Sequence, residues 1–159
     1  MMTTNDIDLV EEATQNKGSL YLGNLDGAWN IKRLNQLDIK HVVSILVKLK
    51  GLKQHYHQSD IAHKVIEVHD SECFDIYPKL YEAADYIESS LLDGNVLVHC
   101  AGGISRSPAC VIAYYIRHRN KTYDEALQLV KYRRPLALPN TGFQKHLKQF
   151  EEHLSQQNN

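Results

Sequence analysis

The sequence lacks the features of a secreted or membrane-anchored protein. Its longest nearly apolar run, Ala109–Ile116, is far shorter than the ~20 residues that a helix needs to span a bilayer. The amino terminus has no basic region followed by an apolar core, and it lacks the glycine that myristoylation needs. The carboxyl-terminal Gln-Gln-Asn-Asn is not a prenylation box. We therefore expect no membrane partner and a cytoplasmic or nuclear location.

Cysteine is also scarce. Cys73, Cys100 and Cys110 are the only three in 159 residues, so they cannot all pair, and a reducing compartment fits better than a disulfide framework. With 43% hydrophobic and 23% charged residues, the composition is that of a globular rather than a disordered chain. The length predicts one domain, and the composition leaves the oligomeric state open.

An excess of either charge is absent too, because 18 Lys and Arg oppose 19 Asp and Glu. The net charge of -1 argues against a nucleic-acid partner. The charges are nevertheless segregated: residues 30–64 and 96–135 each carry an excess of five positive charges, and residues 65–95 an excess of seven negative ones. Most of these charges suit helix faces exposed to water, but the two basic segments could also converge on a site for an anion.

Hydrophobic periodicity predicts an α/β layered domain, in which short strands alternate with helices and the carboxyl-terminal half is helical. The clearest predicted helix, 76–92, has apolar residues at helical spacing. The predicted helix 107–119 is apolar on all sides and is therefore expected at the centre of the fold. Thr122 and Glu125 form a capping box. The predicted strands are 19–22, 41–47, 63–68 and 95–99, and the predicted helices are 28–37, 76–92, 107–119, 122–134 and 141–154.

A short loop between a strand and a helix carries the strongest chemical signal. An apolar strand leads into Cys100, and small residues then lead to Arg106 and Ser107 at the start of a helix. Such a loop turns successive N–H groups into one concavity, and glycine at 102 and 103 permits the backbone conformations that this needs. A cysteine among these donors favours the nucleophilic thiolate, and the guanidinium matches two phosphate oxygens. Ser107 can donate a hydrogen bond to the departing sulfur.

This stretch, His99-Cys100-Ala101-Gly102-Gly103-Ile104-Ser105-Arg106-Ser107-Pro108, resembles the phosphate-binding loop of cysteine-dependent protein tyrosine phosphatases, in its dual-specificity form. Weaker similarities lie at 20–23, 34–47 and 139–143. The resemblance implies a single catalytic domain over 18–154 with a central, mostly parallel twisted sheet flanked by helices. Residues 1–17 are then expected to be a flexible lead-in and 155–159 a polar tail.

The resemblance also implies a general acid on a loop about 30 residues before the cysteine. Asp70 stands 30 residues before Cys100, directly after the strand 63–68. It would protonate the leaving oxygen, which a phosphate ester requires. Glu72 and Asp75 are alternatives, although Asp75 suits the cap of the following helix.

The remaining roles follow from the same resemblance. His99 would orient the nucleophile rather than carry protons, and the loop from Ala101 to Ser105, together with Arg106, would bind the phosphate. No cofactor or metal is expected, because the loop itself neutralises the phosphate charge. The histidines at 55, 57 and 63 lack the acid or cysteine cluster that a metal site needs.

The expected partner is a phosphorylated protein. A short chain without room for a recognition loop predicts a shallow pocket that admits phosphotyrosine and phosphoserine or phosphothreonine alike. The alternatives are an RNA 5′-phosphate, a phosphoinositide, or a module that binds phosphoprotein without turnover. Cys73 lies three residues after Asp70 and is a possible redox partner of Cys100, in a disulfide that would switch activity off. The other interpretation of Cys73 is an ordinary loop cysteine.

Overall fold

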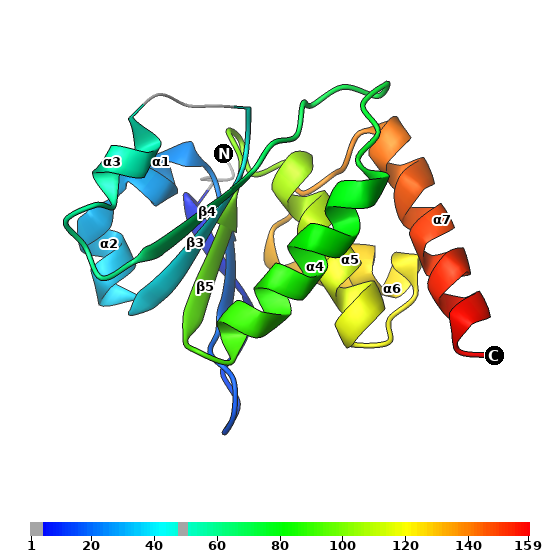
Figure 1. Cartoon of the computed structure of the whole chain (residues 1–159), viewed down its shortest axis with the longest axis horizontal. Coiled ribbons are helices and arrows are strands. Elements are labelled where there is room, and N and C mark those ends of the chain that lie inside the picture. Colours follow the sequence, from blue (N-terminus) through cyan, green and yellow to red (C-terminus); the bar gives the residue numbers. More distant parts are fainter. Residues whose placement is uncertain (1–4, 48–50) are drawn as a thin grey trace.

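The computed structural model describes residues 5–47 and 51–159. Its centre is a five-stranded sheet in the order β1-β2-β5-β3-β4 (Figure 1). Strands β2, β5, β3 and β4 are parallel to one another, and β1 is antiparallel to its neighbour β2. The α/β prediction with a mostly parallel sheet is therefore confirmed. The strands are β1 (Ile7–Glu11), β2 (Leu20–Gly23), β3 (Ile39–Ile45), β4 (Ala62–Ile66) and β5 (Asn95–His99).

Helices cover both faces of the sheet. The short α1, α2 and α3 lie on one side, and the longer α4 to α7 lie on the other (Figure 1). Within the described ranges no helix has both the length and the apolar character needed to cross a membrane. The helices are α1 (Leu25–Trp29), α2 (Ile31–Gln36), α3 (Leu52–His55), α4 (Tyr77–Leu91), α5 (Arg106–His118), α6 (Tyr123–Arg133) and α7 (Thr141–Gln157).

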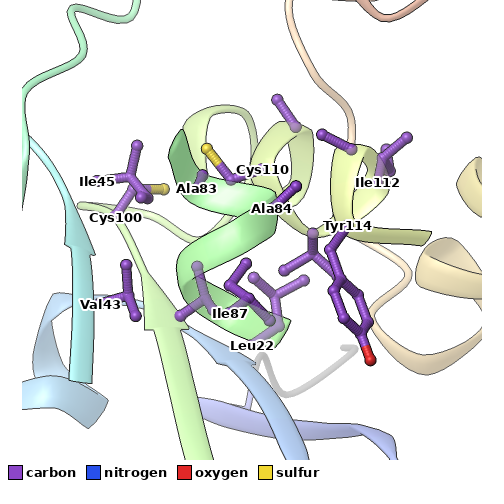
Figure 2. Packing of buried hydrophobic residues seen from close by; sticks show 14 of the residues in the cluster. Leu22, Val43, Ile45, Ala83, Ala84, Ile87, Cys100, Cys110, Ile112 and Tyr114 are labelled. Carbon is purple, nitrogen blue, oxygen red and sulfur yellow. The ribbon is translucent and has the colours of Figure 1, made fainter. Parts of the chain in front are cut away.

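The core lies between the sheet and α4 and α5. Helix α4 buries its apolar stripe, including Ala83, Ala84 and Ile87, and β3 contributes Val43 and Ile45 (Figure 2). Every residue of α5 from 107 to 116 is buried, as the absence of a polar face predicts. This helix therefore has a fixed position, and so does the loop that precedes it.

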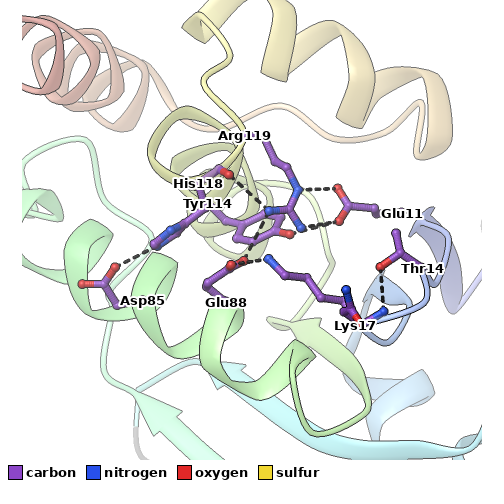
Figure 3. Close-up of polar contacts among 9 residues, drawn as sticks. Glu11, Thr14, Lys17, Asp85, Glu88, Tyr114, His118 and Arg119 are labelled. Carbon is purple, nitrogen blue, oxygen red and sulfur yellow. Dashed lines mark hydrogen bonds and ion pairs between the residues drawn. The ribbon is translucent and has the colours of Figure 1, made fainter. Parts of the chain in front are cut away.

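The amino-terminal segment corrects one expectation. Residues 7–11 are not a flexible lead-in, because they form β1 and bury Val10. The acids that obscured the strand pattern have partners from distant segments: Glu11 accepts a hydrogen bond from Arg119 at 2.8 Å, and Arg119 also pairs with Glu88 (Figure 3). Lys17 pairs with Glu88 as well, so the chain after β1 is fastened to α4 and α5.

Other boundaries differ in smaller ways. The predicted helix 28–37 is two helices, because Asn30 ends α1 and caps α2 by accepting a hydrogen bond from the Arg33 N–H. Helix α7 continues to Gln157 and takes in most of the expected polar tail. The Thr122 and Glu125 capping box is confirmed, with reciprocal hydrogen bonds of 3.2 and 2.9 Å.

Candidate active site

The candidate site lies at the carboxyl edge of the parallel strands, the edge where α/β folds bind ligands. Strand β5 ends at His99, and the loop 100–105 joins it to α5. Strand β4 ends at Ile66 and leads to the segment that carries Asp70. The connection between α6 and α7 also reaches this edge, because the Leu138 N–H donates to the Ile104 carbonyl at 2.7 Å.

Hydrogen bonds from outside the loop hold its first carbonyls. The Cys100 carbonyl accepts from His99 Nδ1 at 3.0 Å. The Ala101 carbonyl accepts from the backbone N–H of Leu25, at the start of α1, also at 3.0 Å. These contacts draw both carbonyls away from the loop centre.

A buried arginine holds the next two carbonyls. Arg134 donates from Nη2 to the Gly102 carbonyl at 3.2 Å and from Nε to the Gly103 carbonyl at 2.8 Å. Its Nη1 pairs with the Asp8 carboxylate of β1 at 2.7 Å, and the side chain is 1% exposed. Arg134 was not predicted, although it follows buried Ala126 and Val130 at intervals of four. An arginine in line with the buried face of α6, at the cap of that helix, was the signal that could have found it.

Five successive carbonyls, from Cys100 to Ile104, are therefore bonded outward. In a trans peptide the N–H points opposite to the preceding carbonyl, and the described backbone has no cis peptide. The N–H groups of residues 101–105 consequently face the loop centre. The Gly103 N–H shows this directly, since it donates to Cys100 Sγ at 3.2 Å. The loop is a cradle of donors for an oxyanion.

Glycine is required at only one of the two predicted positions. Gly103 has a φ of 65°, and an added Cβ would lie 2.5 Å from Arg134 Nη2 and 2.6 Å from the Gly23 carbonyl oxygen. At Gly102 the φ is not positive, and the nearest atom to an added Cβ is Ile104 Cδ1 at 3.4 Å, an ordinary contact. The expectation of a special conformation at 102 is therefore wrong.

Cys100 lies at the base of the cradle with 2% of its surface exposed. Its Sγ accepts hydrogen bonds from the Gly103 N–H and from Ser107 Oγ, the second at 3.1 Å. Both donors stabilise negative charge on sulfur. The other buried cysteine, Cys110 in α5, has no such donors in the described residues, and complete burial raises the pKa of its thiol far above the ordinary value.

Arg106 closes the other side of the loop. Its Nη1 donates to the Val68 carbonyl at 3.3 Å, which ties the guanidinium to the segment leading to Asp70. Its buried Nε has no hydrogen-bond acceptor among residues 5–47 and 51–159. A buried donor without an acceptor is costly, and a phosphate oxygen would satisfy it.

The segment after Val68 is held by the start of α7. Asp70 is exposed and accepts a hydrogen bond from Asn140 Nδ2 at 3.0 Å, while the Asn140 N–H donates to Ser105 Oγ at 2.9 Å. Asn140 therefore joins the acid segment to the cradle, a role that the sequence did not reveal. Gly142 makes this packing possible, since an added Cβ would lie 2.1 Å from the Glu72 carbonyl oxygen.

The alternatives to Asp70 are placed differently. Asp75 accepts a hydrogen bond from the Tyr77 N–H at 3.2 Å and so caps the start of α4, although Ile76 occupies the formal cap position. The Glu72 side chain is exposed. Cys73 is an exposed free cysteine, whereas Cys100 is buried. The Cys73–Cys100 disulfide stays a prediction.

His99 is fully buried and faces away from solvent. Burial lowers the pKa of its imidazole to about 4, against a smaller opposite effect of the Cys100 carbonyl, so the ring is neutral at pH 7. Among the described residues, no three His, Cys, Asp or Glu side chains are grouped to hold a metal. His55 instead bonds to the Trp29 carbonyl and His63 to Ser44.

Comparison with known proteins agrees with this geometry. The family model of the dual specificity phosphatase catalytic domain matches residues 20–153. A putative tyrosine phosphatase, 123R of Invertebrate iridescent virus 6, is 37% identical over 92% of this chain and 97% of its own length. Human dual specificity protein phosphatase 26 is 37% identical over 86% of this chain, which spans 66% of that relative.

Solved structures show the same fold. The crystal structure of a mouse putative dual specificity phosphatase complexed with zinc tungstate superposes with a TM-score of 0.85 at 30% identity. The match covers 99% of this chain and 94% of that one. By sequence and by structure, the chain belongs to the dual specificity phosphatase family, and its catalytic domain is cysteine-dependent.

Proposed function

We propose that this domain hydrolyses phosphate monoesters on proteins, at phosphotyrosine and at phosphoserine or phosphothreonine, through a phosphocysteine intermediate on Cys100. The observation that carries the proposal is the cradle: five outward-bonded carbonyls turn five N–H groups toward the position beside Cys100 Sγ. Arg106 Nε, for which the described part of the chain supplies no acceptor, lies beside the same loop. A tetrahedral phosphate dianion has the charge and the oxygens to satisfy these donors.

The reaction takes two steps. In the first, the Cys100 thiolate attacks phosphorus, the sulfur–phosphorus bond forms, and the bond from phosphorus to the ester oxygen breaks. Asp70, as a carboxylic acid, gives its proton to the departing oxygen. In the second, Asp70 as a carboxylate takes a proton from water, whose oxygen attacks phosphorus, and the sulfur leaves as thiolate. Ser107 and Gly103 donate to that sulfur and stabilise it as a leaving group.

The rim of the cradle supports a protein substrate. Ile104, Leu136 and Leu138 are 44%, 38% and 49% exposed, and the hydrogen bond between Leu138 and Ile104 holds two of them side by side. Apolar side chains at this position suit the ring of phosphotyrosine or the aliphatic part of a phosphothreonine. The absence of lysine between Ala101 and Ser105 disfavours a phosphoinositide. Three free cysteines support a location in the cytoplasm or nucleus.

A trapping experiment tests the proposal. Cys100→Ser should abolish hydrolysis of an aryl phosphate, because the hydroxyl is a far weaker nucleophile, yet it should still bind a phosphopeptide through the unchanged cradle. Normal turnover by this variant would refute the mechanism. The related mouse structure contains tungstate, so tungstate should compete with the phosphopeptide. A side-by-side assay then identifies the substrate class, with four substrates: phosphotyrosine peptide, phosphothreonine peptide, phosphoinositide and RNA 5′-triphosphate. A preference for the phosphoinositide or for the RNA would refute the protein substrate.

A further inference from the structure

A line of hydrogen bonds leads away from the nucleophile across three strands. His99 Nδ1, at the end of β5, lies 3.0 Å from the Cys100 carbonyl oxygen. The other ring nitrogen, Nε2, lies 2.5 Å from the Ser44 hydroxyl of β3. That hydroxyl lies 2.8 Å from Nε2 of His63 in β4, at the edge of the sheet. The line therefore joins the loop to the outermost strand.

The direction of each hydrogen bond is fixed by chemistry. A carbonyl oxygen only accepts, so His99 Nδ1 carries the proton. The ring is neutral because burial lowers its pKa to about 4, and its Nε2 therefore accepts from the Ser44 hydroxyl. Because the Ser44 hydroxyl donates its proton to His99, its oxygen accepts the hydrogen bond that His63 Nε2–H donates. Burial, with Lys53 nearby, lowers the pKa of His63 as well, and its Nε2–H is present in either charge state.

We propose that Ser44 and His63 are positioning residues for Cys100, which select the Nδ1–H tautomer of His99 and thereby hold the Cys100 carbonyl outside the cradle. The proposal rests on the proposed function for its effect on turnover, but the tautomer it specifies is a property of the resting protein. Without the Ser44 hydroxyl, a neutral His99 could carry its proton on Nε2 instead. A lone pair on Nδ1 would then face the Cys100 carbonyl, and the peptide that aims the Ala101 N–H at the phosphate would be released.

The surroundings of Ser44 favour this role over ordinary packing. Ser44 is completely buried in β3 between Val43 and Ile45, where an apolar side chain would be more stable unless the hydroxyl were bonded. His63 packs against Tyr56, with ring centroids 4.8 Å apart. The far end of the line is accessible, because His63 and Ser44 line a pocket of about 360 Å³ between α3 and β4 that also includes Leu46, Leu52 and Val65.

Paired substitutions distinguish positioning from packing. His63→Ala removes the donor, whereas His63→Gln places an amide N–H near the position of Nε2. His55→Ala is the matched control, because His55 is also a half-buried histidine on this side but bonds to the Trp29 carbonyl rather than to Ser44. We expect His63→Ala and Ser44→Ala to lower kcat about fivefold, as the loss of one neutral hydrogen bond does, with KM changed less than twofold. His63→Gln and His55→Ala should stay within twofold of the unmodified protein.

Chemical rescue uses the pocket. Imidazole should enter the space left by His63→Ala and restore at least half of kcat, and it should not restore Ser44→Ala. Ser44→Thr retains the hydroxyl and should have the kcat of the unmodified protein. This variant tests the role of the hydroxyl even where Ser44→Ala fails to fold. Equal losses in His63→Gln and His63→Ala, or an absence of rescue, would overturn the proposal.

The closing experiment does not need turnover. NMR spectra of protein labelled with ¹⁵N-histidine report which ring nitrogen of His99 is protonated. We expect a single Nδ1–H form in the unmodified protein and a detectable Nε2–H population in Ser44→Ala. An unchanged Nδ1–H signal in Ser44→Ala would overturn the proposal. An unmodified protein without phosphatase activity would refute the proposed function and leave this tautomer test intact.

Discussion

Arg134 is predicted to be essential for the cradle although it is absent from the recognised motif. Arg134→Met keeps most of the aliphatic stem and removes every donor. The Gly102 and Gly103 carbonyls then lose the bonds of 3.2 and 2.8 Å that turn them outward, and the N–H groups of Gly103 and Ile104 lose their fixed direction. The same change leaves the Asp8 carboxylate, which is 13% exposed, without its cation, although Asn5 Nδ2 still donates to it at 2.9 Å.

The expected magnitudes follow from these contacts. Complete removal of one oxyanion donor typically lowers kcat by about 10²–10³. Two donors that are misaligned part of the time should lower kcat/KM by roughly 10–100-fold. Leaving one partner of a fully buried ion pair alone costs about 3–5 kcal/mol. Because Asp8 is partly exposed and keeps the Asn5 hydrogen bond, the free energy of unfolding should fall by less than this.

Asp8→Asn separates the two effects. It removes the carboxylate charge but leaves Arg134 bonded to the loop carbonyls, so it should be destabilised with kcat/KM within about threefold of normal. Both variants are assayed on an aryl phosphate at a temperature where urea titration shows them to be folded, and tungstate binding is measured by calorimetry. Equal kcat/KM for Arg134→Met and Asp8→Asn would refute the reasoning, because the carbonyl bonds would then be irrelevant to the cradle.

Three further outcomes are expected. Asp70→Asn should lower kcat by about 10²–10³ on an alkyl phosphate and much less on p-nitrophenyl phosphate, whose leaving group needs no acid. If Asp75→Asn shows this dependence on the leaving group instead, Asp75 is the general acid. Gly103→Ala should lower kcat/KM at least about tenfold, because its Cβ would meet Arg134 and the Gly23 carbonyl, and Gly102→Ala is the control expected to be tolerated. The pKa of His99 falls from 6.5 to about 4 on folding, so the unfolded chain binds more protons between these values and stability decreases as the pH falls. Urea titrations should show that this group lowers the free energy of unfolding by roughly 2 kcal/mol between pH 7 and pH 5. An equal decrease in His99→Gln would contradict the assignment of this pH dependence to His99.

The sequence predicted those parts of the site that are close together along the chain. Cys100 and Ser107 are seven residues apart, and a strand–loop–helix pattern is sufficient to bring their side chains within 3.1 Å. The spacing of the phosphate-binding loop and the glycine at 103 follow from the same local geometry. The α/β layering was predictable as well, because apolar strands alternated with helices of clear periodicity, whereas the mostly parallel sheet was expected from the family resemblance.

Contacts between distant segments were not predictable in the same way. Arg134 lies 31 residues from Gly103, and Asn140 lies 35 residues from Ser105. Polar residues at helix ends are common, and nothing local indicates that α6 ends and α7 begins beside this loop. Strand β1 was missed for a related reason, because its acids suggested exposure until their arginine partners were placed.

The pairing of Asp8 with Arg134 spans 126 residues and has a consequence for the order of events during synthesis. Strand β1 is synthesised well before α6, so Asp8 leaves the ribosome long before the guanidinium that neutralises its charge. Cys100 and Arg106 are thus translated before the side chain that shapes their loop exists. A nascent chain that stops before α6 carries the whole recognised motif without an ordered cradle, so catalytic competence should appear only after Arg134 has been synthesised.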